Sequence, residues 1–74
     1  SNGFIIEMEK KELANTLTET FPELQRTEKN VLVFRGDENR FFDIMQYISK
    51  NKIPIQKIER IESTLESLFL EVTK

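Results

Sequence analysis

The sequence predicts an α+β fold, a ferredoxin-like split β-α-β sandwich with an added C-terminal helix, and three observations support this prediction. Apolar residues recur at every second position along short segments, the period of half-buried strands. Other segments, including the end of the chain, carry apolar residues at the i, i+3, i+4 spacing of amphipathic helices. The resulting order is β-α-β-β-α-β-α, in which a short hairpin joins two βαβ-like halves.

The first third of the chain predicts a strand, a helix and a polar strand. Phe4, Ile6 and Met8 recur at every second position, which predicts the first strand. The helix that follows has one apolar face, made of Leu13, Ala14, Leu17 and Phe21. Pro22 ends this helix because the residue before a proline disfavours helical backbone angles. Residues 24–28 have few apolar anchors, so we expect a strand at a sheet edge.

A turn at residues 28–30 precedes the most β-prone segment of the chain. Asn30 is able to take a left-handed backbone conformation in this turn. Residues 31–34 are apolar and mostly β-branched or aromatic, which predicts a central strand. Val31 and Val33 face opposite to the other two residues of that strand, so both faces of the sheet carry apolar side chains.

A second helix and a fourth strand complete the sheet. Asp37 is a candidate N-cap for this helix. Its apolar stripe consists of Phe41, Ile44, Met45 and Ile48, flanked by Phe42 and Tyr47. Residues 51–54 end the helix, and residues 55–61 form the fourth strand. We expect an antiparallel sheet with both helices on one face and right-handed crossovers.

The chain ends with a capped amphipathic helix. Ser63 and Glu66 occupy the ends of an [ST]-x-x-E capping box. The apolar stripe that follows, with the adjoining Leu70, forms a candidate interface of Leu65, Leu68, Phe69, Leu70 and Val72. Two alternatives stay open for this stripe. It is ordinary core that covers the open face or an edge of the sheet, the favoured alternative, or it contacts another domain or a second copy.

The same stretch resembles the C-terminus of ABC-transporter ATP-binding subunits, especially those of drug and antibiotic exporters. The shared pattern is Ile-Glu-x-Ile-Glu, then Ser/Thr-Leu-Glu-x-x-Phe-Leu-x-x-Thr. The matching residues are Ile58, Glu59, Glu62, Leu65, Glu66, Phe69, Leu70 and Thr73. Upstream of residue 58 the chain resembles these proteins only in the pattern of its elements. The family usually has a proline before the Ser-Leu-Glu equivalent, where this chain has Ser63 and Thr64, and either version starts a helix.

The resemblance implies a non-catalytic accessory or regulatory domain that contacts the nucleotide-binding domain or its dimer mate. ATP and Mg²⁺ would be bound by an upstream domain, and the parent subunit would drive a membrane-spanning permease from the cytoplasmic face of the cell membrane. Residues 1–3 lack an initiator Met and resemble a tag-cleavage scar. We therefore expect residues 4–74 to be one accessory domain taken from a longer ATPase chain.

Composition excludes several chemistries from these 74 residues. His and Cys are absent, which excludes His-based triads, thiol catalysis and the usual zinc ligands. Two glycines cannot supply a P-loop. A net charge of −2 argues against a nucleic-acid partner. We expect no catalytic, cofactor-binding or metal-binding residue here, and interpret the basic residues Lys50, Lys52, Lys57 and Arg60 as a solvated grouping.

An ACT-like small-molecule-sensing regulatory domain is the alternative function. Such domains share the β-α-β-β-α-β plan, pair edge to edge, and often bind an amino acid beside a glycine-containing loop after the first strand. Here that junction, residues 9–11, has no glycine, which weakens the alternative. A free-standing scaffold domain is a third hypothesis.

Overall fold

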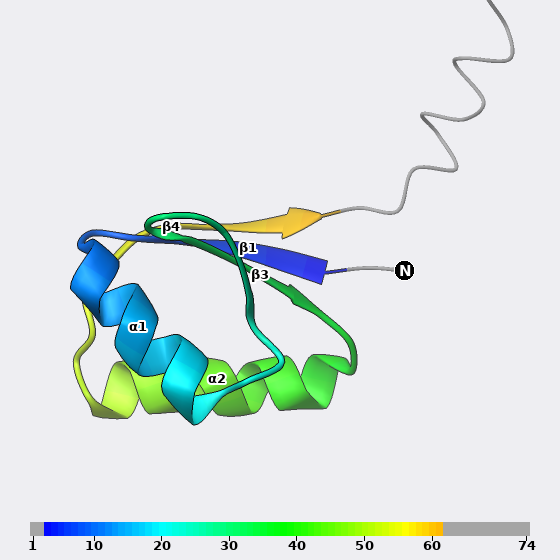
Figure 1. Ribbon diagram of the computed structural model, residues 1–74. Coiled ribbons are helices and arrows are strands. Elements are labelled where there is room, and N and C mark those ends of the chain that lie inside the picture. The colour runs from blue at the N-terminus through cyan, green and yellow to red at the C-terminus, as the bar shows by residue number, and fades with distance from the viewer. Residues whose placement is uncertain (1–2, 62–74) are drawn as a thin grey trace, which may run out of the picture.

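The computed structural model describes residues 3–61, which form a four-stranded antiparallel sheet with two helices on one face (Figure 1). The strands are β1 (Gly3–Met8), β2 (Gln25–Glu28), β3 (Val31–Arg35) and β4 (Ile55–Ile61), and the helices are α1 (Lys11–Thr20) and α2 (Glu38–Lys50). This α+β architecture is compatible with the predicted small split β-α-β sandwich. The expected C-terminal helix falls on residues 62–74, outside the described residues.

Each βαβ half of the domain is split by a strand from the other half. The strand order is β2-β3-β1-β4, so β3 lies between β1 and β2, while β1 lies between β3 and β4. All three neighbouring pairs are antiparallel. Ile6 stands opposite Leu32 on one side and Ile58 on the other. Since opposed residues share a sheet face, this row points toward the helices.

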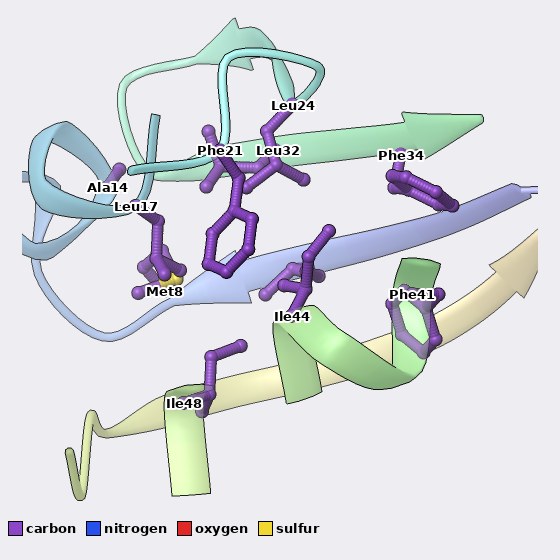
Figure 2. Close-up of a cluster of buried hydrophobic side chains, with 11 residues drawn as sticks. Met8, Ala14, Leu17, Phe21, Leu24, Leu32, Phe34, Phe41, Ile44 and Ile48 are labelled. Atoms are coloured by element: carbon purple, nitrogen blue, oxygen red, sulfur yellow. The ribbon is translucent and has the colours of Figure 1, made fainter. Parts of the chain in front are cut away.

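The hydrophobic core lies between the helices and the sheet (Figure 2). Its members are Ile6, Met8, Ala14, Leu17, Phe21, Leu24, Leu32, Phe34, Phe41, Ile44 and Ile48. The alternation of β1 and the apolar stripes of both helices are therefore confirmed. Phe41 stacks on half-buried Phe4, with ring centroids 3.6 Å apart, and lies 5.8 Å from the ring of Phe34.

Local contacts fix both ends of α2. The Asp37 side chain accepts a hydrogen bond from the backbone N–H of Asn39, which confirms the predicted N-cap. At the other end the Ile53 N–H donates to Ile48 O at 3.0 Å and the Lys52 N–H donates to Ser49 O at 3.1 Å. These two bonds are the Schellman pattern, which needs a left-handed residue after the cap.

The turn after α2 contains a residue in the left-handed conformation. Among the non-glycine residues of the described chain, Lys52 alone has a positive φ, 52°. Asn30, which the sequence marks as able to adopt this conformation, does not have a positive φ, and its side chain and carbonyl bond to β1. Asn30 Nδ2 donates to Met8 O at 2.9 Å, and the Met8 N–H donates to Asn30 O at 2.7 Å.

The first strand begins at Gly3, one of the three residues expected to be tag-derived. Gly3 is buried and stands opposite Arg35 of β3 and Ile61 of β4. A Cβ atom at this position would lie 2.5 Å from the carbonyl oxygen of Phe34, closer than real Cβ atoms approach. The close approach of the two central strands here therefore requires glycine.

The face of the sheet away from the helices carries a patch of half-buried apolar side chains, as the sequence predicts. Ile5, Val31, Val33 and Ile61 are each intermediate in exposure. Ile5 stands directly opposite Val33, so the patch crosses the two central strands. The C-terminal stripe, one candidate to cover this patch, lies outside the described residues. Between residues 3 and 61 no helix is long and apolar enough to cross a membrane.

Candidate functional site

The candidate interface predicted from the sequence lies outside residues 3–61, so all five of its members remain a prediction: Leu65, Leu68, Phe69, Leu70 and Val72. Of the residues that carry the family resemblance, Ile58 and Glu59 are described, and both lie in β4. The described part of the resemblance is therefore a strand at one edge of the sheet, and its surroundings form the first candidate site.

β4 is an exposed edge strand. It pairs with β1 along one side, and among the described residues no strand pairs with its other side. Residues 56–60 are all exposed. The register shift between the two strands lies beside Met8, so residues 57–61 run without interruption against β1. Ile58 is 38% exposed, although it stands opposite the fully buried Ile6.

Charged side chains of β4 make different contacts on the two faces. Lys57 Nζ lies 3.6 Å from Glu59 Oε1, two residues along the strand and therefore on the same face. Arg60 lies on the helix face, where it donates to Glu38 Oε2 at 2.7 Å and its guanidinium carbon is 4.7 Å from the ring centroid of Phe4. The basic grouping anticipated from the sequence is thus divided, because Lys57 and Arg60 face opposite sides of the sheet.

One hollow lies between α1 and β2. It is open, has a volume of about 720 Å³, and is lined by Lys11, Glu12, Asn15, Arg26, Thr27, Glu28 and Lys29. Its central cation, Arg26, is already bonded. Nε donates to Lys29 O at 2.8 Å, Nη2 donates to Lys11 O at 2.7 Å, and Nη1 donates to Asn15 Oδ1. The guanidinium therefore ties α1 to the β2–β3 turn, and an anion would have to displace these oxygens.

A second, smaller hollow lies beside the aromatic pair Phe21 and Tyr47, whose rings meet edge to face at 5.3 Å. Arg40 of α2 covers the Phe21 ring at 5.0 Å and donates from Nε to Glu23 Oε2. The hydrogen bond from Arg40 holds the pKa of Glu23 below its usual value, and the same bond raises the pKa of Arg40. This ion pair fastens the segment before β2 to α2.

The polar side chains described above join one element of the fold to another. Between residues 3 and 61 no cluster of three or more acidic, His or Cys side chains is placed to hold a metal ion. In the same range, no polar or charged residue is buried. The hydrogen bonds, ion pairs and cap described above account for Arg26, Arg40, Arg60 and Asp37. The exposed edge of β4 is a long surface whose backbone groups are open to a partner strand.

Comparison of the chain with protein-family models, with curated proteins and with solved structures gave no match. The family resemblance of residues 58–73 therefore remains a hypothesis from the sequence.

Two features of this region escaped the sequence prediction. The bracing role of Arg26 has no sequence pattern, because its partners on α1 and in the β2–β3 turn meet only in the folded domain. The second feature is the distribution of charge along β4, where Lys57 and Glu59 flank the exposed Ile58 symmetrically. That symmetry is visible in the sequence, but it matters only for a strand known to lie at an edge.

Proposed function

We propose that this chain is the non-catalytic C-terminal accessory domain of the ATP-binding subunit of an ABC transporter of the exporter type, with its sheet in the ferredoxin-like order. The observation that carries the proposal is the pattern at residues 58–73. Its first part, which the family resemblance expects to be a strand, falls on Ile58 and Glu59 of β4. The strand order β2-β3-β1-β4 supports the ferredoxin-like arrangement.

The domain would act through contacts with protein. Its proposed partners are the nucleotide-binding domain upstream and the second ATPase subunit, and through the parent protein a membrane-spanning permease. ATP and Mg²⁺ would be bound upstream, at the cytoplasmic face of the membrane. The exposed β4 edge and the predicted stripe at residues 65–72 are the surfaces that such contacts would use.

The reading frame upstream of Gly3 provides the first test. A G-x-x-x-x-G-K-[ST] loop after a predicted strand supports the proposal, because its backbone N–H groups and lysine bind nucleotide phosphates. An initiator Met within a few codons, with no such loop, overturns it.

Deletion in the full subunit provides the second test. Removing residues 4–74 should change the ATPase rate or the coupling of ATP hydrolysis to transport, and unchanged values for both would contradict the proposal. A matched, shorter deletion of residues 62–74 separates the contribution of the predicted last helix from that of the sheet.

One observation favours the ACT-like alternative enough to test it. The hollow beside Arg26 is lined by Lys11 and Glu12 at the start of α1, close to the junction where such domains bind amino acids. A ligand that binds only the native state raises its melting temperature. Each amino acid should therefore be titrated while the melting temperature is recorded, and the absence of any rise would remove this alternative.

A further inference from the structure

β4 is complementary to itself. Its sequence is Ile55-Gln56-Lys57-Ile58-Glu59-Arg60-Ile61, with Ile58 at the centre. When two such strands run antiparallel with the Ile58 residues opposite each other, Lys57 of each copy faces Glu59 of the other. On the neighbouring row Gln56 faces Arg60. Every charge next to the centre thus meets an opposite charge, a pairing that stabilises cross-strand neighbours.

The side chains that would meet are available in the single chain. Ile58 is 38% exposed, and the side chains of Lys57 and Glu59 are 61% and 57% exposed. Within the copy, Lys57 and Glu59 pair loosely at 3.6 Å along one strand, so a partner strand would add contacts to charges that water now solvates. The backbone is also available, since β1 occupies one side of β4 and, among the described strands, none occupies the other.

The charge pattern selects an antiparallel second copy. A parallel copy in register would set Lys57 against Lys57 and Glu59 against Glu59, and like charges placed opposite each other are destabilising. Charged residues on an edge often prevent pairing. Here, however, the two signs are arranged symmetrically about Ile58, so pairing neutralises them.

We propose that β4 is a dimerisation edge, on which a second copy of this chain pairs antiparallel with Ile58 at the two-fold axis and the two sheets become continuous. The proposal is independent of the proposed function, because it concerns this chain alone and holds for any parent protein.

Charge reversal on the whole chain tests the edge. Glu59→Lys sets lysine against lysine twice in each dimer, and Lys57→Glu sets glutamate against glutamate twice. Sedimentation equilibrium should show that each variant alone has a dimer dissociation constant at least about tenfold higher than that of the unmodified chain. Glu28→Lys, a matched reversal on the opposite edge strand β2, should leave dimerisation unchanged.

Mixing the two variants separates pairing from structural damage. A Glu59→Lys copy paired with a Lys57→Glu copy restores both opposite-charge contacts across the edge, whereas the Lys57–Glu59 pair within each strand stays broken. The mixture should therefore form a heterodimer at least as tight as the unmodified dimer, visible by native mass spectrometry with one copy isotopically labelled.

Three results would overturn the proposal. One is an unmodified chain that stays monomeric up to about 1 mM, a concentration that excludes even weak association. Another is a dimer whose strength neither β4 reversal changes, which would place the contact elsewhere. The third is a mixture in which the two folded variants fail to associate.

Discussion

The two edge strands of this sheet differ in length and in the regularity of their pairing. β2 has four residues, a register shift between Arg26 and Glu28, and an arginine whose guanidinium bonds to α1 and to the following turn. β4 has seven residues and pairs without interruption from residue 57 to residue 61. Short strands and bulges are common means of blocking an edge, whereas a long regular edge remains a template for another strand. β2 is therefore a short, interrupted edge, whereas β4 is a long and regular one that could accept another strand.

The side chains on the two edges reflect the same contrast. On the β2 side, Arg26 and the Glu23–Arg40 pair connect the edge region to the two helices. On the β4 side, Arg60 alone among the strand's charged residues reaches a helix, at Glu38, while Lys57 and Glu59 contact only each other in the contacts described above. Four substitutions test how far the two edges depend on separate supports.

Phe41→Ala should have the largest effect, because it removes the ring that supports the β4 side. Phe41 is buried, and Phe4, stacked on it, carries Arg60 on its own ring. We expect the free energy of unfolding, measured in urea, to fall by about 3–5 kcal/mol. Hydrogen exchange should quicken more in β4 than in β2.

The adjacent residue provides the control for this substitution. Phe42 is 58% exposed, so Phe42→Ala should cost less than about 0.5 kcal/mol. A similar cost for both substitutions would contradict the described core.

Arg26→Ala should weaken the β2 edge selectively. It removes the hydrogen bonds to Lys29 O, Lys11 O and Asn15, and charge-assisted bonds of this kind contribute about 1–2 kcal/mol where water competes. Urea unfolding gives the cost, and exchange of the β2 amides should quicken while that of β4 stays unchanged. Gln25→Ala, on the same strand, is the control. If the two substitutions cost the same, Arg26 does not brace this edge.

Lys52→Gly should stabilise the connection that leads from α2 into β4. Lys52 has a φ of 52°, a left-handed conformation that residues with a Cβ atom adopt at a cost in free energy. We expect a gain of about 0.5–1 kcal/mol, the left-handed penalty less the backbone entropy that glycine loses. Lys52→Ala keeps the penalty and should give no gain. Equal stabilities of the glycine and alanine variants would argue against the left-handed turn.

Glu23→Gln should have the smallest effect and one that depends on pH. The lowered pKa of Glu23, due first to its hydrogen bond with Arg40, means that the folded chain favours the carboxylate more than the unfolded chain does. The pair thus adds stability above the usual carboxyl pKa, and this is lost as the pH falls through the folded value. Both groups are exposed, so the contribution is small.

The measurement for this variant is the free energy of unfolding across a pH series. The unmodified chain should be the more stable at pH 7, and the difference should shrink as the pH falls below the usual carboxyl pKa, vanishing once the carboxyl is protonated in the folded chain as well. A difference that stays constant with pH would show that the ion pair is not its source.

Much of the fold was predictable because it depends on local pattern. The alternation in β1, the helical stripes, the Asp37 cap and the bounds of β4 are each encoded within one element, and all are confirmed. The candidate site was less predictable. Its sequence-derived residues lie beyond residue 61, while the exposed β4 edge depends on which strands become neighbours.

The conformation of Asn30 and the bracing role of Arg26 both involve contacts between distant segments. Asn30 tolerates a left-handed conformation but does not adopt it, and it forms hydrogen bonds with Met8, 22 residues away. In the sequence Arg26 is an ordinary polar residue of an edge strand. Only the folded chain places the Lys11 carbonyl 2.7 Å from its Nη2 atom. Sequence pattern describes what each residue tolerates, and long-range contacts choose among the tolerated states.

Within residues 3–61 the sequence by itself determined the elements, their order and the faces that both helices and β1 bury, and its composition excludes chemistry that needs His or Cys. Periodicity, capping and composition suffice for these because they act within a few residues of the chain. The tertiary structure alone decided that β4 lies at an edge, that Ile58 is exposed while the opposing Ile6 is buried, and that Arg26 ties the other edge strand to α1. These properties belong to pairs of segments far apart in sequence, and they exist only once the sheet has formed.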